Sequence, residues 1–282
     1  MTIGVLLMGG LGNQMFQYGT AYALARRHDG RVSVDLSGYQ FWNNYQHFEL
    51  WRFSSLGLSP IQLPLAMVRR GLFRLGISSV FKPSFTMEGL GYDERVIDLP
   101  DGSNIKGWFQ SERYFLDAIG DIKAKFDLDP FLPQGGREAI ERLRPVGGAV
   151  AAVHVRRGDY VGSSVFDILT ATYYRTAMDT LSHRKKCRFV LFSDDSEWCK
   201  AQPQFQSENI NFFVDLKLPC SALNEMAMMS ICDCQIISNS TFSWWAAWLN
   251  KNSSKIIIMP KQWLSQYSAD DCGLSVPGWI QI

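Results

Sequence analysis

The 282-residue sequence predicts an α/β fold made of two Rossmann-like domains that face a cleft. Apolar residues make up 46% of the chain, which provides a large core and argues against global disorder. Strand-like and helix-like segments alternate, as they do in doubly wound parallel sheets. Pro145-Val-Gly-Gly148 is the best hinge, so we expect domains at 1–145 and 146–282.

The amino-terminal half opens with a β-α-β pattern. A strand at about 3–8 leads through a glycine-rich turn into a helix at 13–27, whose apolar residues recur at helical spacing. A second strand follows at 31–36, and such a start predicts a parallel sheet. From about 37 to 99 the sequence is rich in aromatic and turn-forming residues without clean periodicity. We expect a partly helical insertion there.

The carboxyl-terminal half is more regular. Strands are expected at 149–156, 188–193, 211–215, 235–238 and 255–259, and helices at 171–184, 223–232 and 240–249. Because strands and helices alternate throughout this half, each strand should return through a helix to lie parallel to the others.

Charge and hydropathy exclude several kinds of partner. The chain has 28 basic and 27 acidic side chains, so nothing draws it as a whole to nucleic acid or to anionic membranes. No apolar run is long enough to span a bilayer, and residues 1–8 lack the basic start of a signal peptide. We expect a cytoplasmic protein without a transmembrane segment, and peripheral membrane contact stays open.

The cysteines do not form a recognisable metal motif. The six of them lie at positions 187, 199, 220, 232, 234 and 272. Cys232-Asp-Cys234 lacks the C-x-x-C gap and has no histidine nearby, so a zinc site is not expected. Reduced and mostly buried thiols are the expected state in a cytosolic protein.

The first candidate ligand-binding segment is the turn Gly9-Gly10-Leu11-Gly12-Asn13. Glycines let a backbone approach a ligand closely, and the amino terminus of a helix offers free N–H groups to an anion. The motif departs from G-x-G-x-x-G, and no acidic residue at a suitable strand end could bind a ribose. A phosphate contact and a tight turn are therefore equally good interpretations.

The second segment is HVRRGDY at 154–160, where a hydrophobic strand runs directly into charge. With a period of two, His154 and Arg156 share one face of the strand. Arginine presents a planar fork of donors that suits phosphate oxygens, and doubly wound folds bind ligands at the carboxyl ends of their strands. The alternative is structural, with one of these arginines and Asp159 forming an ion pair that caps the strand.

The third segment is Ser193-Asp194-Asp195, again directly after a strand. Paired acids suggest a divalent metal, but no further carboxylate or histidine cluster completes a hydrated Mg²⁺ or Mn²⁺ site. A helix cap is as good an interpretation as a functional role.

The fourth segment is a strand-to-helix turn at 237–249 that is rich in hydroxyl groups. The hydroxyls of Ser240 and Thr241 and the N–H groups of a helix start can together bind a pyrophosphate. Trp244, Trp245 and Trp248 are expected to pack the helix onto the sheet, and sugar stacking is the alternative.

In this order, GGLGNQMFQY, HVRRGDY and SNSTFSWWAAWL resemble the α-1,2-fucosyltransferase family, glycosyltransferase family 11. The resemblance extends from the first strand to about Lys261 and is weakest in the insertion at 37–99. One departure is Gly19, where alanine often follows the QY pair. The resemblance implies a GT-B-like fold, GDP-L-fucose as donor, and inversion at the anomeric carbon without a metal or other cofactor. Bacterial relatives make O-antigens and similar glycans.

The resemblance also implies residue roles. In relatives with H-x-R-R-x-D the first arginine, here Arg156, contacts the β-phosphate. Glu225 occupies the position of a carboxylate that binds the guanine edge, which a carboxylate matches with two hydrogen bonds; an exposed helix-face acid is the alternative. Asp159 is either the general base or a group that aims Arg156. The expected donor-binding residues are His154, Arg156, Arg157, Glu225, Ser240, Thr241, Gly10, Gly12 and Asn13, and the expected catalytic residues are Arg156 and Asp159.

The resemblance therefore implies a galactoside α-1,2-L-fucosyltransferase whose partners are GDP-L-fucose and a galactose-terminated oligosaccharide. The first domain and its insertion should hold the acceptor, and the second domain should hold the GDP-sugar. One alternative is a glycosyltransferase of the same fold with another linkage or nucleotide-sugar donor. Another is a non-catalytic glycan-binding protein. A dinucleotide-dependent oxidoreductase is disfavoured by the missing fingerprint and by the two arginines.

Overall fold

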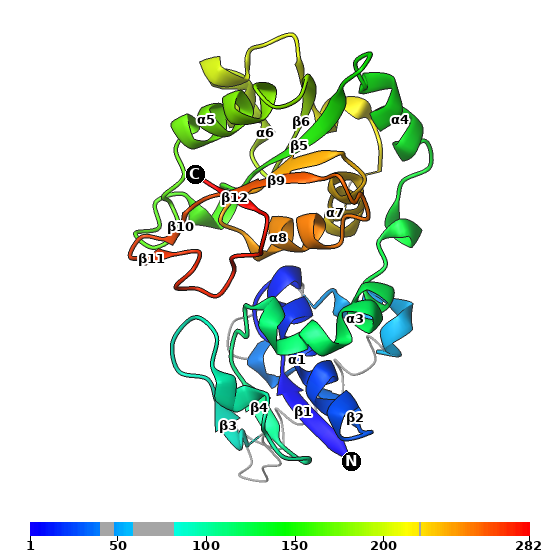
Figure 1. Cartoon of the computed structure of the whole chain (residues 1–282), viewed down its shortest axis with the longest axis vertical. Coiled ribbons are helices and arrows are strands. Elements are labelled where there is room, and N and C mark those ends of the chain that lie inside the picture. Colours follow the sequence, from blue (N-terminus) through cyan, green and yellow to red (C-terminus); the bar gives the residue numbers. More distant parts are fainter. Residues whose placement is uncertain (40–47, 59–81, 220) are drawn as a thin grey trace. The chain divides into compact units, whose positions relative to one another are not determined.

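The computed structural model describes residues 1–39, 48–58, 82–219 and 221–282. The chain forms two compact units. Unit 1 consists of Met1–Asp127 with Asp271–Leu274, and unit 2 consists of Leu128–Asp270 with Ser275–Ile282. Each unit combines helices with a parallel sheet (Figure 1), which confirms the predicted α/β class. How the two units face each other stays a prediction.

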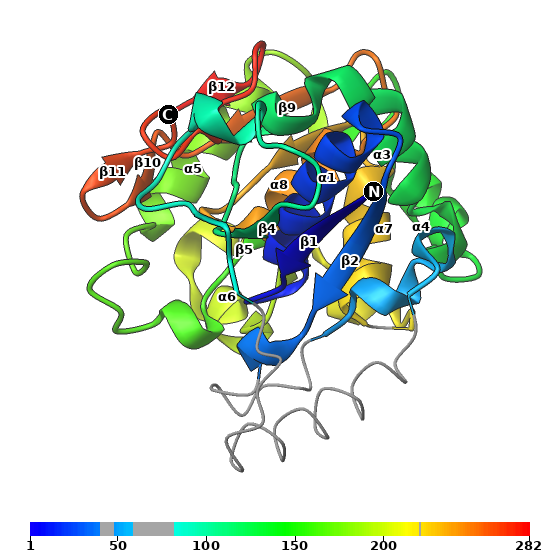
Figure 2. The same cartoon turned by 90° about the horizontal axis from the view of Figure 1, so that it is seen from below.

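Unit 1 is built on a four-stranded parallel sheet in the order β2-β1-β4-β3. Its strands are β1 (Thr2–Leu6), β2 (Arg31–Asp35), β3 (Phe85–Thr86) and β4 (Asn104–Lys106). Helix α1 (Leu11–Arg27) joins β1 to β2 and packs on both strands, as Figure 2 shows. The helix buries Met15, Phe16 and Leu24 completely, so the expected β-α-β start is confirmed.

The expected insertion at 37–99 is described only in part, because residues 40–47 and 59–81 lie outside the described residues. Its described segments form short 3-10 turns and the strand β3. The turns are η1 (Ser37–Tyr39), η3 (Leu50–Arg52), η4 (Ser54–Leu56) and η5 (Glu94–Val96). Two further elements, η6 (Glu112–Ala118) and α3 (Ile119–Lys125), complete unit 1 and pack against each other.

Unit 2 has a six-stranded parallel sheet in the order β12-β9-β8-β5-β6-β7. Its strands are β5 (Ala149–Val155), β6 (Cys187–Ser193), β7 (Ile210–Phe212), β8 (Cys234–Ile236), β9 (Ile256–Met259) and β12 (Ile280–Gln281). Counted from β5, this is the 3-2-1-4-5-6 order of a doubly wound fold. In such folds the ligand crevice lies where the strand order reverses, here at the carboxyl ends of β5 and β8.

Helices cover both faces of this sheet (Figure 1). Helices α5 (Ala171–Ser182) and α6 (Ser196–Ala201) lie on one face, and α7 (Ala222–Ser230) and α8 (Thr241–Trp248) lie on the other. One face of β5 packs in a core with Tyr174 and Leu181 of α5. Trp244, Trp245 and Trp248 are all buried, as expected for side chains that pack α8 onto the sheet.

Two expectations about unit 2 need correction. The strand expected at 211–215 ends at Phe212, because Phe213 turns into the core and starts the 3-10 turn η10 (Phe213–Leu216). The units divide at 127/128, ahead of the hinge expected at Pro145. The reason is α4 (Gly136–Leu143), an element that the sequence did not reveal, which contacts β5 and so belongs with unit 2.

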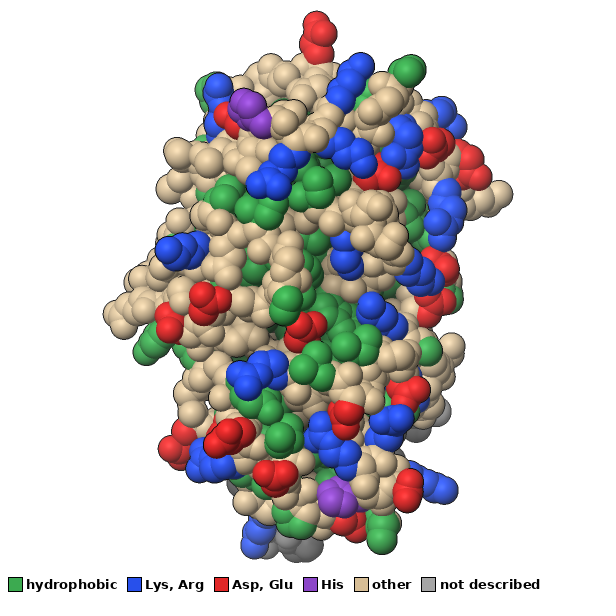
Figure 3. Space-filling model, in the orientation of Figure 1, with side chains coloured by type: hydrophobic (Ala, Val, Ile, Leu, Met, Phe, Trp, Pro, Cys, Tyr) green, Lys and Arg blue, Asp and Glu red, His purple; other side chains and the backbone are tan. Residues whose placement is uncertain are grey.

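Acidic and basic side chains are interspersed over the face shown in Figure 3, in keeping with the balanced composition. None of the helices in the described part of the chain is long and apolar enough to cross a membrane. Five cysteines are described, and all five are buried and unbridged.

Candidate functional site

Three charged or polar segments meet at one edge of the unit 2 sheet. Strand β5 lies between β6 and β8, and all three strands are parallel. The segments that follow them therefore leave the sheet side by side. They carry Arg156–Asp159 after β5, Asp194–Asp195 after β6, and the 237–241 turn after β8. This edge contains the reversal in strand order at which ligands bind.

His154 lies on β5 just before this edge and is almost fully buried. Its Nδ1 shares a hydrogen bond of 2.8 Å with Oγ of Ser238, and its ring lies 5.5 Å from that of Phe242 in α8. Burial, followed by the nearby charge of Arg156, lowers the pKa of His154 to about 3. The imidazole is therefore neutral and supports the 237–241 turn. Direct donor binding by His154 stays a prediction.

Arg156 is held between two carboxylates. Its Nη2 lies 2.5 Å from Oδ1 of Asp159, and its Nη1 lies 2.6 Å from Oδ2 of Asp194. The guanidinium lies over the ring of Tyr160, 5.5 Å from the centroid. Since Asp159 follows β5 and Asp194 follows β6, the fork is fixed from two separate segments. A guanidinium has five N–H donors, so further donors remain for an anionic ligand.

Arg157 is directed toward β6 and α6. Its Nε lies 3.0 Å from Oδ2 of Asp195, and its guanidinium stacks 3.8 Å from the ring of Trp198. Its backbone N–H donates to Oδ1 of Asp194 at 2.9 Å. The two arginines are thus held by different aspartates and point in different directions.

Asp194 and Asp195 bind the two arginines, a role that the sequence did not assign to them. Asp195 caps α6 by accepting from the N–H of Trp198 at 3.1 Å, so the helix-cap interpretation is confirmed for this residue. The hydrogen bond from Arg157, and after it the one from Trp198, lowers the pKa of the Asp195 carboxyl. Asp194 instead joins the side chain of Arg156 to the backbone of Arg157. The sequence feature that could have identified both aspartates as site residues is their position directly after a strand.

Gly158 makes this arrangement sterically feasible. A Cβ at position 158 would lie 2.5 Å from Oδ2 of Asp194, far inside van der Waals contact. The glycine in HVRRGDY therefore lets the Asp194 carboxylate reach Arg156 across the turn.

The 237–241 turn is tied to the loop that follows β5. Nδ2 of Asn239 donates to the carbonyl oxygens of Phe166 and Trp263, at 3.0 and 3.1 Å. The hydroxyl of Tyr160 donates to the carbonyl of Asn239 at 3.3 Å. These bonds hold the start of α8, with Ser240 as its N-cap and Thr241 as its first residue, at the edge that carries Arg156. Tyr160 and Asn239 were not expected as site residues.

The remaining expected residues lie elsewhere. Glu225 is half-buried in the first turn of α7, which packs against α8. Gly10, Gly12 and Asn13 belong to unit 1, where Gly10 is the N-cap of α1. Unit 2 therefore brings together His154, Arg156, Arg157, Asp159, Ser240 and Thr241, and the donor-binding roles of the whole set stay predictions.

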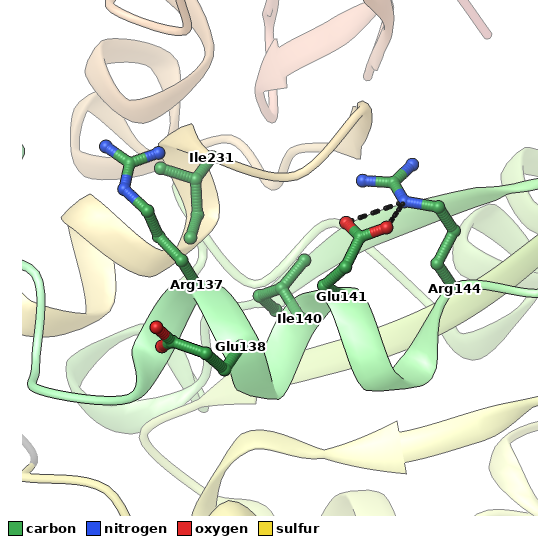
Figure 4. Close-up of a pocket in the computed structure, with 6 residues that line it drawn as sticks. All are labelled: Arg137, Glu138, Ile140, Glu141, Arg144 and Ile231. Atoms are coloured by element: carbon green, nitrogen blue, oxygen red, sulfur yellow. Dashed lines mark hydrogen bonds and ion pairs between the residues drawn. The ribbon is translucent and has the colours of Figure 1, made fainter.

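A surface pocket of about 350 Å³ lies along α4, away from these residues (Figure 4). It is lined by Arg137, Glu138, Ile140, Glu141, Arg144 and Ile231. Its arginines are neutralised within the unit, because Arg137 pairs with Asp129 at 2.9 Å and Arg144 pairs with Glu141 and Asp233. The pocket therefore lies where α4 packs against the rest of unit 2, and its arginines already have acidic partners.

Among the described residues, no group of three or more His, Cys, Asp or Glu is placed to hold a metal ion.

Comparison with known proteins gives consistent matches. The family model described as Glycosyl transferase family 11 matches residues 104–282. An α-1,2-colitosyltransferase of Escherichia coli is 29% identical over 98% of this chain and 97% of that protein. The O-antigen biosynthesis glycosyltransferase WbnK of Escherichia coli is also 29% identical, over 98% of this chain and 99% of WbnK. A galactoside α-(1,2)-fucosyltransferase 1 of Saimiri boliviensis boliviensis is 27% identical over 86% of this chain and 63% of its own length.

Proposed function

The chain belongs to glycosyltransferase family 11, and on that premise we propose that it is an inverting galactoside α-1,2-L-fucosyltransferase. It takes L-fucose from GDP-β-L-fucose and transfers it to the 2-hydroxyl of a terminal galactose. The names of two relatives, an α-1,2-colitosyltransferase and a galactoside α-(1,2)-fucosyltransferase, support the linkage.

The observation that carries the proposal is the double anchoring of Arg156 at the reversal in strand order. When the bond from the anomeric carbon to the β-phosphate breaks, its electron pair stays on the phosphate oxygen. The charge that develops there needs donors that are already in place. Arg156, the start of α8 and the hydroxyls of Ser240 and Thr241 supply them at one edge.

We propose that this charge is met without a metal ion. The paired aspartates that suggest a metal site are each bound to an arginine, Asp194 to Arg156 and Asp195 to Arg157. The acceptor hydroxyl attacks the face of the anomeric carbon opposite the leaving phosphate and gives up its proton as the new bond forms. Asp159 or another carboxylate at the acceptor site receives that proton.

A second donor has specific support. One relative of similar length is an α-1,2-colitosyltransferase, and colitose is L-fucose without its 3-hydroxyl. Both sugars would present the same 6-deoxy carbon and the same anomeric configuration to the site. They differ in one hydroxyl, and a site that hydrogen-bonds this hydroxyl would discriminate strongly between them.

The decisive experiment supplies lactose with GDP-fucose, GDP-colitose or GDP-mannose and follows GDP release and the linkage formed. GDP-fucose should give the fastest turnover and an α-1,2-linked product. Excess EDTA should leave the rate nearly unchanged. A preference for GDP-colitose would reassign the donor, and activity that collapses in EDTA and returns with Mn²⁺ would refute the metal-free mechanism.

Glu225→Gln tests the expected guanine contact. The amide replaces one acceptor oxygen by a donor, so it no longer matches the two adjacent donors of guanine. A mispaired base edge costs about 1–3 kcal/mol, so GDP affinity should fall about tenfold while weak ADP binding changes little. Isothermal titration with both nucleotides measures the difference. Equal GDP affinity in a folded variant would make Glu225 a helix-face acid and nothing more.

Gly158→Ala tests the support of Arg156. The new Cβ would displace the Asp194 carboxylate, which lies 2.5 Å from its position, and so remove one anchor of the fork. GDP affinity should fall about tenfold, the size expected for one charge-assisted hydrogen bond. Gly120→Ala is the matched control, because a Cβ there meets nothing within 4 Å. Wild-type GDP affinity in Gly158→Ala would show that Asp194 does not matter for the donor.

A further inference from the structure

The carboxyl edge of the unit 1 sheet carries an exposed tryptophan. Strands β1 and β4 are parallel neighbours, so the segments that follow them, 7–10 and 107–110, leave the sheet at the same edge. Trp108 lies in the second of these segments with 40% of its surface exposed. Tryptophan is highly buried on average, and the carboxyl ends of parallel strands are where α/β folds place ligands. An exposed indole at this edge therefore needs an explanation.

Trp108 lies against the glycine turn that follows β1. A Cβ on Gly9 would lie 3.1 Å from Cζ3 of the indole and 2.6 Å from Nδ2 of Asn13. Gly9 has φ +73°, and its carbonyl accepts from the hydroxyl of Tyr39 at 2.9 Å and from Nε2 of Gln14 at 3.0 Å. The missing side chain lets the indole and the amide approach the backbone, and the two hydrogen bonds make that backbone rigid.

The backbone beside Trp108 is strained. Phe109 has φ +51°, a conformation that is unfavourable for a bulky residue, and its ring is fully buried. That ring packs edge-on against Tyr114 with centroids 5.8 Å apart. At Gly107 a Cβ would lie 3.0 Å from the same ring, so the ring fills the space beside that glycine. Phe109 is turned into the core, whereas the side chain of the preceding residue, Trp108, is turned outward.

The amide of Asn13 lies beside the indole and is bonded to a second amide, that of Gln110. Nε2 of Gln110 donates to Oδ1 of Asn13 at 2.8 Å, which joins the segment after β4 to the first turn of α1. Within the described part of the chain, Oε1 of Gln110 accepts no hydrogen bond. An aromatic face beside fixed amides is suited to a pyranose, whose C–H face stacks on the ring while its hydroxyls bond to the amides.

We propose that Trp108, with Gln110 and Asn13, is the binding platform for a pyranose ring of the acceptor glycan. The platform rests on the proposed function only for the identity of that ring, a β-galactoside. It gives Asn13 a partner on the acceptor, in place of the donor contact expected from the sequence. The strained Phe109 and the tight approach to Gly9 hold the indole in place before the glycan arrives.

The test is a titration of lactose, in the presence of saturating GDP, followed by ligand-observed NMR and by acceptor KM. Trp108→Ala should weaken lactose binding about tenfold or more, whereas Trp108→Phe should stay within about threefold because it keeps an aromatic face. Leu116→Ala is the control, because it removes another exposed apolar side chain from unit 1, one that is 50% exposed. The Kd for GDP should stay the same in all three variants, and thermal unfolding shows that each is folded.

The outcomes separate the platform from the proposed function. Wild-type lactose affinity and acceptor KM in Trp108→Ala would overturn the platform and leave the transferase function standing. Loss of GDP and lactose binding together in a folded Trp108→Ala variant would also overturn it, because the indole would then serve the donor. A wild-type protein that binds GDP but no lactose refutes the platform. Binding of lactose through Trp108 without any GDP binding would instead refute the proposed function.

Discussion

Arg156→Ala should reduce kcat about 10²–10³-fold, which corresponds to about 3–4 kcal/mol of lost transition-state stabilisation. The guanidinium lies at the reversal in strand order with Nη1 and Nη2 already bound to Asp194 and Asp159, so its orientation is set before the donor binds. Charge on the β-phosphate grows as GDP leaves, and the contact should strengthen in step with it. KM for the donor should therefore change less than kcat. Steady-state kinetics with GDP-fucose and lactose measure both.

Two variants control this experiment. Arg156→Lys should recover only part of the activity, because an ammonium cannot bridge two carboxylates and a phosphate as a planar fork does. Arg175→Ala removes an arginine that is also paired with an aspartate, Asp179 at 3.4 Å, but on the exposed side of α5. It should leave kcat unchanged. Full activity in a folded Arg156→Ala variant would refute the role of this residue in the reaction.

The carboxyl-terminal strands were readable in the sequence because their chemistry is local. Strand β5, Ala149–Val155, is buried along its whole length, and buried parallel strands appear as unbroken apolar runs. The change from apolar to charged residues at Arg156 marks the strand end as well as the site. The predicted end of the strand at 211–215 was wrong because a short apolar run does not show where a strand gives way to a 3-10 turn.

The contacts within the site were not readable, because they join distant parts of the chain. Asp194 follows Arg157 by 37 residues and reaches its backbone only because β5 pairs with β6 in a register that aligns Val155 with Ser193. No local pattern contains that register. Trp108 was missed for a different reason, since a phenylalanine such as Phe109 gives no sign in the sequence that its φ is positive. Sequence alone therefore identified the arginines and Asp159, but it did not identify the contacts of Asp194 or the exposed indole.

Asp159→Asn should lower GDP affinity and transfer together, about tenfold to a hundredfold. Oδ1 of Asp159 lies 2.5 Å from Nη2 of Arg156, so the carboxylate acts on the fork that meets the donor. Asparagine keeps the shape but removes the charge, and a charge-assisted hydrogen bond is worth about 1.5–3 kcal/mol. The side chain is 71% exposed, which places the expected loss nearer the lower limit. Asp179→Asn, in the exposed pair on α5, is the matched control.

The same variant separates the two roles open to Asp159, because each predicts a different pattern. A residue that positions Arg156 affects every step that uses the fork, so GDP binding, slow hydrolysis of the donor and transfer should all decrease in proportion. A general base acts only when the acceptor hydroxyl loses its proton, so its removal would reduce transfer about 10²–10⁴-fold and spare GDP binding and hydrolysis. Asp194 holds Nη1 of Arg156 at 2.6 Å in either case, so the fork keeps one anchor and the protein should stay folded.

Measuring GDP affinity, donor hydrolysis and lactose transfer on one preparation distinguishes the two patterns. Near-normal values for all three would exclude both roles, and the proton acceptor would then have to be a different carboxylate.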